Sequence, residues 1–374
     1  MNILVAGDYC PQNRVAQSFD NDEFSLCLSE IKPILENVDY SIVNFESPIT
    51  KGGEKTLQKF GPNLRCSSKA ISAIKWVGFN CVTLANNHFL DYGEEGVCNT
   101  LEELRIHSLD YVGGGQNLSD ASKILYKIIE GETLAIINCC EHEFSIASEN
   151  SAGSNPLNPV QQYYAIQDAK QKADRILLIV HGGHEHYQLP SPRMKETYRF
   201  FIDAGADVVV NHHQHCFSGY EVYKNKPIFY GIGNFCFDKR ECDKQWTEGY
   251  CVIIEFNNSV NFKLIPYIQC RDSAKVSLMK GDDLLEFDSE LDHLNKIIAN
   301  HVLLNKHFED LSRKMQKALW SSYEPYSGKV LNHLFAHGFL PSLFGKSRKI
   351  KALNFVECES YHDLMIDSLK KQTK

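Results

Sequence analysis

Long apolar runs are absent from this sequence of 374 residues, and nowhere do the roughly 18 uninterrupted apolar residues of a membrane-spanning helix occur. The first residues, Met-Asn-Ile-Leu-Val-Ala-Gly-Asp, carry neither a charged leader nor the apolar core and cleavage pattern of a signal peptide. These two absences predict a protein that works in the cytoplasm and has no membrane span.

Blocks of like charge are missing as well. Lysine and arginine number 39 against 47 aspartate and glutamate, which gives a formal net charge of -8, and neither sign is concentrated in a long segment. Non-specific binding of nucleic acid depends on a basic face. The sequence therefore argues against a nucleic-acid partner, and we interpret the short basic cluster at 346–351 as a solvated helix face.

Cysteine pairs with Cys-x-x-Cys spacing are also lacking, although the chain holds 13 cysteines. That spacing is typical of structural zinc sites and dithiol redox sites, so neither is expected. The odd number and scattered positions predict free thiols. Cys139 and Cys140 follow an apolar run, which favours burial as small hydrophobic residues, so a cysteine-based mechanism is not expected.

Short apolar runs, by contrast, alternate with segments of helical periodicity through most of the first 270 residues. This alternation is typical of an α/β domain with parallel strands. The predicted buried strands are 3–6, 40–43, 81–84, 134–137, 176–180 and 208–210, and the predicted helices are 24–35, 68–76, 96–104 and 194–204.

The pattern changes after residue 210, where closely spaced strands are predicted at 217–223, 227–232, 250–256 and 261–268. Strands that meander in this way after an α/β half suggest a second sheet packed on the first. From about residue 273 the sequence reads as mostly helical. We therefore expect an α/β domain over 1–270 and a helical C-terminal extension over 271–374.

Polar side chains follow five of the predicted strands at the point where each strand ends. In an open α/β sheet the carboxyl ends of the strands line the ligand crevice. The residues at these ends are Asp8; Glu46; Asn86, Asn87 and His88; His181, His184, Glu185 and His186; and His212, His213 and His215.

Imidazole, carboxylate and amide oxygen together form a ligand set for manganese, iron or zinc, and this many ligands would suit two ions. Taken singly, most of these motifs have an ordinary explanation as a helix cap, a turn or a flexible connector. Together those explanations need five coincidences at one edge, so a dinuclear hydrolase is favoured. In an extended segment His213 and His215 would point the same way and His212 would not; we expect the first two as ligands and His212 as a supporting or packing residue.

Several longer motifs occur in a fixed order and resemble the CapA family, which is named for capsule and poly-γ-glutamate biosynthesis. This family is a branch of the calcineurin-like metallophosphoesterase fold, and the resemblance implies a four-layer α-β-β-α sandwich over about residues 3–270. The motifs are "GD" at 7–8, "NFE" at 44–46, "LANNHFLDYGEEG" at 84–96, "HGGHEH" at 181–186, "DAGADVVVNHHQH" at 203–215 and "IFYGIGNFCFD" at 228–238.

The resemblance also implies roles for individual residues. His88 corresponds to a catalytic proton donor, and Glu185 is a candidate acid, base or supporting residue. Asn86, Asp91 and His212 are expected to support the site, and Arg65 is a candidate substrate contact. The implied contacts to two divalent ions (manganese, iron or zinc) are Asp8, Glu46, Asn87, His181, His213 and His215.

Three departures from the usual metallophosphoesterase pattern stand out. Cys10 occupies the position of the histidine in Asp-x-His, Asn211 replaces the glycine of Gly-His-x-His, and Glu46 stands where an aspartate usually bridges the metals. The first departure would leave one metal with one ligand fewer.

Three functional hypotheses follow. The leading one is a metal-dependent, phosphoesterase-like hydrolase acting on a small, anionic polymer precursor in capsule, exopolysaccharide or poly-γ-glutamate-type synthesis. The second keeps the metals but forms or cleaves an amide on an acidic polymer or glycoconjugate. The third is a non-catalytic accessory subunit of a polymer-synthesis complex, whose partner proteins would dock on the helical extension.

Overall fold

The first strand, β1 (Asn2–Tyr9), shows how the core is divided in this computed structural model, which describes residues 1–239, 243–321, 323–326 and 328–372. Ile3 and Val5 belong to a buried cluster that joins side chains of two sheets. Leu4 and Ala6 point to the opposite face, into a second cluster that is shared with helices. Because successive side chains of a strand alternate between faces, β1 is covered on both sides, as in a layered sandwich.

Two large sheets form the centre of the first of two compact units, Met1–Leu304. The first sheet has the order β16 (Val276–Leu278), β15 (Val260–Gln269), β14 (Glu248–Phe256), β1, β2 (Tyr40–Phe45), β3 (Cys81–Thr83) and β4 (Asp110–Val112), with β13 (Asn234–Cys236) paired to β1. The second has the order β11 (Tyr220–Tyr223), β12 (Lys226–Phe229), β10 (Val208–His212), β9 (Arg175–His181), β7 (Glu132–Cys140) and β6 (Leu125–Ile129). A small third sheet pairs β5 (Gly114–Gly115) with β8 (Gly153–Ser154).

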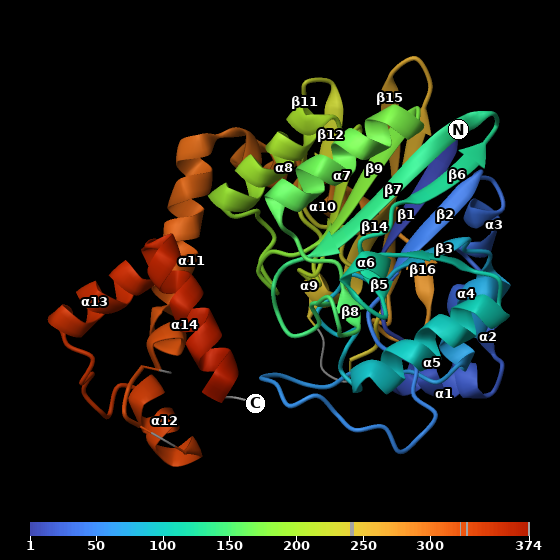
Figure 1. The fold of residues 1–374 in the computed structure, drawn as a ribbon. Coiled ribbons are helices and arrows are strands. Elements are labelled where there is room, and N and C mark those ends of the chain that lie inside the picture. The colour runs from blue at the N-terminus through green and yellow to red at the C-terminus, as the bar shows by residue number, and fades with distance from the viewer. Residues whose placement is uncertain (240–242, 322, 327, 373–374) are drawn as a thin grey trace. The chain divides into compact units, whose positions relative to one another are not determined.

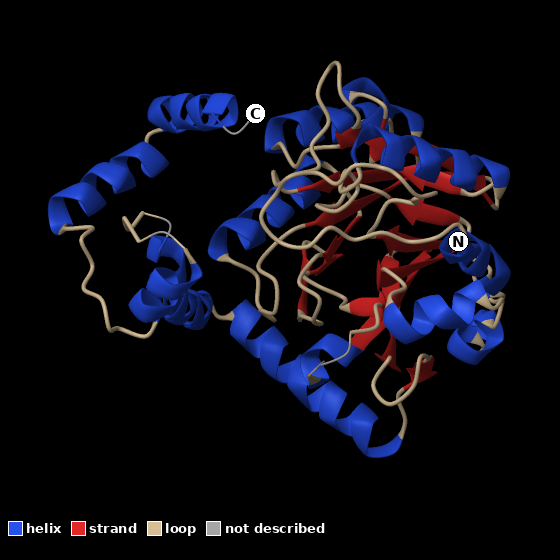
Figure 2. Ribbon diagram, turned by 90° about the horizontal axis from the view of Figure 1, so that it is seen from below, coloured by secondary structure: helices blue, strands red, loops and turns tan. Residues whose placement is uncertain are grey.

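Helices cover the outer faces of the two sheets, which confirms the expected four-layer α-β-β-α sandwich (Figures 1 and 2). On the second sheet, Asn158 caps the helix Pro159–Lys172 and Ser191 caps the helix Pro192–Ala204, each with a proline in the first turn. On the first sheet, Gly78 ends the helix Lys69–Val77 in a left-handed conformation. The first sheet carries α1 (Asn13–Asp20), α2 (Phe24–Leu28), α3 (Lys32–Leu35), α4 (Lys69–Val77) and α5 (Gly93–Ile106); the second carries α7 (Pro159–Lys172) and α8 (Pro192–Ala204). The short helices α6 (Leu118–Ala121) and α9 (Lys244–Thr247) lie in connecting segments.

The later strands do not form a sheet of their own, contrary to the expectation from the sequence. Strands β11 and β12 extend the sheet of β10, whereas β14 to β16 extend the sheet of β1 in antiparallel fashion. Each sheet is thus built from both halves of the sequence: β12 joins β10 in parallel, and β14 joins β1 in antiparallel fashion. The helix predicted at 24–35 is also divided, into α2 and α3.

The first unit continues beyond residue 270, to Leu304. Strand β16 pairs with β15, and α10 (Gly281–Ala299) buries Phe287, Leu291 and Leu294 in the same core as the second sheet. The second unit, Asn305–Lys374, holds most of α11 (His301–Ser321) together with α12 (Lys329–Ala336), α13 (Lys346–Glu357) and α14 (Glu359–Gln372). Its interior includes an aromatic contact between Trp320 and Phe344, whose ring centroids lie 5.5 Å apart.

The described cysteines are all free thiols; Cys242 lies outside the described residues. Within the described part of the chain, no helix combines the length and the apolar character that crossing a bilayer requires.

The close crossing of β1 and β13 leaves no room for a side chain at Gly7. A Cβ atom there would lie 1.9 Å from the carbonyl oxygen of Gly233, which accepts a hydrogen bond from the amide of Asp8 at 3.1 Å. We expect Gly7→Ala to lower the free energy of unfolding by about 3 kcal/mol, because backbone rather than a flexible side chain must move. Urea unfolding monitored by circular dichroism measures this change, and an unchanged midpoint would contradict the expectation.

Candidate metal centre

The carboxyl ends of the parallel strands β1, β2 and β3 meet those of β7, β9 and β10. Asp8 lies near the end of β1, and Glu46 directly follows β2. His181 ends β9 and is in register with His212, the last residue of β10. The backbone amide of His213 donates to Oδ2 of Asp8 at 3.2 Å, so the two sheets touch at this edge.

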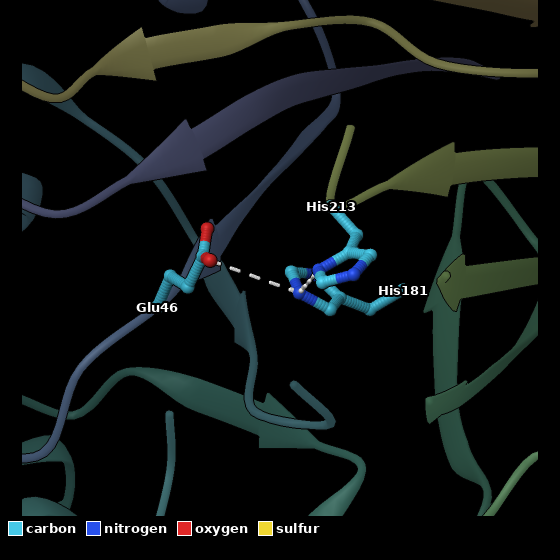
Figure 3. Close-up of side chains that lie close together, drawn as sticks. All are labelled: Glu46, His181 and His213. Atoms are coloured by element: carbon cyan, nitrogen blue, oxygen red, sulfur yellow. Dashed lines mark hydrogen bonds and ion pairs between the residues drawn. The ribbon is translucent and has the colours of Figure 1, made fainter. Parts of the chain in front are cut away.

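Two groups of buried side chains are arranged so that each could hold a cation. Glu46, His181 and His213 form one group, and Asp8, Glu46 and His215 form the other; within each, the ligand atoms lie within 4.8 Å of one another. Glu46 belongs to both. Figure 3 shows its carboxylate facing the two imidazoles of His181 and His213. Carboxylates of the first sheet therefore face histidines of the second.

Acceptor atoms converge on Nε2 of His181. This nitrogen lies 3.1 Å from Oδ1 of Asn87, 3.1 Å from Nδ1 of His213 and 3.7 Å from Oε1 of Glu46. One proton on Nε2 can satisfy one of these contacts, whereas a divalent cation would satisfy several at once. The donor set of imidazole nitrogen, carboxylate and amide oxygen suits manganese, iron or zinc.

Glu46 provides the clearest test of whether a cation fits. Its side chain is fully buried, and neither carboxylate oxygen accepts a hydrogen bond. Burial, reinforced by the nearby charge of Asp8, raises the pKa of Glu46 well above its usual range. An ionised carboxylate buried without a partner is strongly unfavourable, and a cation between Glu46 and the histidines would supply that partner. The residues present fit a bound metal.

The histidine-rich segment is not extended, contrary to the expectation from the sequence. His213 and His215 have φ values of 90° and 56°, in the left-handed region that non-glycine residues seldom occupy. The two rings join different groups, which share Glu46. Strained backbone of this kind is concentrated at functional sites.

The ring orientation of His215 is fixed by Asn234 on β13. The Asn234 amide donates to the carbonyl oxygens of His215 and Trp246, so its Oδ1 accepts from Nδ1 of His215 at 2.9 Å. Nε2 of His215 is then left without a proton and lies 3.6 Å from Oε1 of Glu46. Burial lowers the pKa of His215 to about 4, so the ring is neutral and able to bind a metal near neutral pH.

Asp8 is surrounded by donors. Asn44 donates to its Oδ1 at 2.7 Å, and Nδ1 of His212 lies 3.2 Å from the same oxygen. His212 is buried beside Asp8 but belongs to neither group of three, and its Nε2 has no hydrogen-bond partner among the described residues. His212 therefore contacts Asp8, one of the expected ligands.

His88 forms a second constellation with Asp91. Nδ1 of His88 lies 2.6 Å from Oδ2 of Asp91, and the Lys59 ammonium contacts Oδ1 of the same carboxylate. Asn86 accepts the His88 amide at 3.1 Å and donates to the carbonyl oxygen of Phe45 at 2.8 Å, which ties this loop to β2. Since a carboxylate can only accept, Nδ1 carries the proton and Nε2 is the free nitrogen of His88.

Two candidate residues lie apart from these groups. Glu185 is exposed and makes no direct contact with either group among the described residues. Its charge adds to the effect of burial, which raises the pKa of Glu46, and opposes the effect of burial, which lowers the pKa of His215. Arg65 is exposed, and its guanidinium lies 5.9 Å from the ring centroid of Tyr92. The structure therefore does not bring Arg65 to the two groups.

Four side chains at the site escaped the sequence reasoning: Asn44, Lys59, Glu143 and Asn234. Glu143 could have been found by the same strand-end rule, because β7 continues to Cys140, three residues beyond its predicted end. Asn44 and Asn234 lie inside quoted motifs. Lys59 lies in the irregular loop 51–66, where no periodic pattern indicates its position.

Asn211 makes side-chain hydrogen bonds that a glycine could not make. Its Oδ1 accepts from the Tyr198 hydroxyl at 2.6 Å, and its Nδ2 donates to the carbonyl oxygens of Gly182 at 2.8 Å and Tyr230 at 3.0 Å. Asn211 thus holds the loop after β9 against β10. Cys10 is buried and lies in neither group of three.

Comparison with known proteins places these features in a family. The model of the bacterial capsule synthesis protein PGA_cap matches residues 2–239. The capsule biosynthesis protein CapA of Bacillus anthracis is 33% identical over 247 residues, which cover 64% of this chain and 60% of that protein. The PGA biosynthesis protein CapA of Bacillus subtilis strain 168 is 35% identical over 217 residues, covering 56% of each. The match thus spans little more than half the length of these relatives.

More distant matches include a Mycobacterium tuberculosis protein described as a probable polyglutamine synthesis accessory protein, 28% identical over 56% of this chain and 59% of that protein. Among solved structures, the 5'-nucleotidase of Candida albicans matches with 12% identity and a TM-score of 0.44 over 84% of this chain and 57% of that one. The family model covers well over half of the chain and includes all the residues of both groups of three. The chain belongs to the bacterial capsule synthesis protein family PGA_cap, which includes the CapA proteins.

Proposed function

We propose that this protein is a metal-dependent hydrolase of the phosphoesterase type with two divalent ions, manganese, iron or zinc. Its substrate would be an anionic precursor in the synthesis of a capsule, exopolysaccharide or poly-γ-glutamate-type polymer. The observation that carries the proposal is Glu46, a buried carboxylate without hydrogen bonds that is shared by two groups of ligands. A protein that only served as a scaffold would have no physical reason to bury it in this way.

Each ion would have its own set of ligands, with Glu46 common to both sets. Glu46, His181, His213 and Asn87 would hold one ion, and Asp8, Glu46 and His215 the other. Two bound ions would supply Lewis-acid polarisation of the phosphoryl oxygens and a clamp on the reacting group. When both ring nitrogens of His88 carry a proton, Asp91 would accept from Nδ1 and His88 would donate the proton on Nε2 to the departing oxygen.

Charges near His88 support that role. Lys59, whose side chain is 2% exposed, pairs with Asp91 and holds its carboxylate in place beside His88. Glu185 lies near enough to influence Glu46 and His213 electrostatically, and we propose that it assists proton transfer or orders the substrate. Arg65 remains a candidate contact for a long substrate rather than for its reacting group.

Amide chemistry is the second candidate, because one relative is named for PGA biosynthesis and another for polyglutamine synthesis. The same ligand set could polarise an amide carbonyl. An accessory role within a polymer-synthesis complex, with partner proteins bound to Asn305–Lys374, is the third; the name of the Mycobacterium tuberculosis relative favours it. A cytoplasmic location belongs to the proposal, since free thiols persist in a reducing compartment.

Elemental analysis of the purified protein tests the metal, and parallel assays test the bond. Phosphoesters, γ-glutamyl amides and aminoacyl-sugar amides are each incubated with the manganese-loaded protein. We expect two equivalents of a transition metal and turnover of a phosphoester. Turnover of amides alone would favour the second candidate, whereas bound metal without turnover, together with normal polymer output from a His88→Ala strain, would favour the accessory role. Absence of bound metal would contradict the proposal.

A further inference from the structure

Glu143 lies beside the candidate metal centre but has no role in the function proposed above. It follows β7 by three residues, and its side chain is 34% exposed. Its Oε1 lies 3.3 Å from Nε2 of His213. One carboxylate therefore contacts an imidazole of the expected ligand set.

The contact with His213 determines which ring nitrogen is free. An ionised carboxylate can only accept, so Nε2 of His213 carries a proton. The lone pair of the neutral ring is then on Nδ1, which lies 3.1 Å from Nε2 of His181. The reversed ring or the other tautomer would point a proton into the space between His181 and Glu46 and would exclude a cation.

We propose that Glu143 is a positioning residue that presents Nδ1 of His213 to a metal ion held together with Glu46 and His181. The proposal rests on the proposed function only in that a metal must bind. Its effect is confined to the group of Glu46, His181 and His213, because Asn234 performs the corresponding task for His215 in the other group. A substitution at Glu143 would thus change the metal affinity of one position and leave that of the other unchanged.

Carboxylates that orient a metal-binding histidine typically change metal affinity by about 10- to 100-fold when they are removed. The effect of each substitution follows from the contact with His213. Glu143→Ala removes the acceptor. Glu143→Gln keeps an oxygen that can accept from His213 but loses the negative charge, so it should restore part of the affinity.

Calorimetric titration of metal-free full-length protein with Mn²⁺ tests the proposal. For Glu143→Ala we expect one of the two binding events to weaken about 10- to 100-fold, with the other unchanged. Glu143→Gln should lie between Glu143→Ala and the wild type. Glu149→Gln serves as a matched control, since this exposed glutamate lies on the same connection after β7 but lies in neither metal-binding group.

Thermal unfolding of the metal-free variants separates positioning from loss of structure. Unchanged affinity at both positions in Glu143→Ala would overturn the proposal. Equal weakening of both positions together with a lower melting temperature would overturn it as well, because Glu143 would then support the fold and not one ion. A wild type that binds no Mn²⁺ would overturn this proposal and the metal-dependent function together, and the wild-type titration alone reveals that outcome.

Discussion

Glu46→Gln is expected to abolish binding of both metal ions, with more than about a 100-fold loss of affinity at each position. The reason is that Glu46 alone belongs to both groups of ligands, and a direct ligand matters more than the residues that orient it, whose removal costs about 10- to 100-fold. His215→Ala, in contrast, should remove one ion and leave the other. Metal content after gel filtration, measured by mass spectrometry, distinguishes these patterns.

Glu36→Gln provides the control for Glu46→Gln, because Glu36 is exposed at the end of α3 and the charge change is the same. Its metal content should equal that of the wild type. Two ions bound to Glu46→Gln with unchanged affinity would show that the carboxylate is not shared between the metals. The proposed dinuclear site would then be wrong, whatever activity the protein has.

His88→Ala is expected to reduce the turnover of a phosphoester by about 100- to 10,000-fold, the usual contribution of a positioned general acid. Both metals should remain, because His88 lies outside both groups of ligands. This pairing of full metal content with lost turnover separates a proton donor from a ligand. Steady-state kinetics and metal analysis on the same preparation measure both quantities.

A leaving group of low pKa offers a further check on His88. Such a group departs without a proton, so an activated ester should be hydrolysed by His88→Ala nearly as fast as by the wild type. His107→Ala is the matched control, since His107 caps the end of α5 and hydrogen-bonds to the carbonyl oxygen of Glu103 at 2.9 Å. Equal loss of turnover for activated and ordinary esters would contradict the role of His88 as a general acid.

Much of the fold could be predicted because buried parallel strands appear in the sequence as short continuous apolar runs. The runs around Ile3, Ile42, Val82, Leu178 and Val209 all lie in strands. The partners of the later strands could not be predicted, since the short apolar runs that predict β11 and β14 as strands do not indicate which sheet each strand joins. Pairing of distant strands depends on the three-dimensional packing and leaves no local pattern.

The candidate site was predictable to the extent that its side chains follow strands. Asp8, Glu46, His181, His213 and His215 fall at strand ends, and the structure brings all five together. The reasoning was less successful for backbone conformation, because the segment expected to be extended has positive φ at His213 and His215.

Side chains from irregular loops escaped prediction for a related reason. Lys59 reaches Asp91 from the loop 51–66, whose path is fixed by individual hydrogen bonds such as that from the amide of Leu64 to Asp91 at 2.6 Å. Such bonds depend on the folded structure and have no periodicity. A lysine in a loop is therefore indistinguishable in sequence from a solvated one.

The origin of the ligands in two different sheets has a thermodynamic consequence. Asp8 and Glu46 come from the first sheet, and His181, His213 and His215 come from the second. A bound ion would therefore link the two sheets of the sandwich. A ligand that binds only the folded chain adds about 2.7 kcal/mol to its stability when the free concentration is 100 times the dissociation constant. The folding equilibrium would thus be linked to metal supply, and a chelator would loosen the contact between the sheets as well as empty the site.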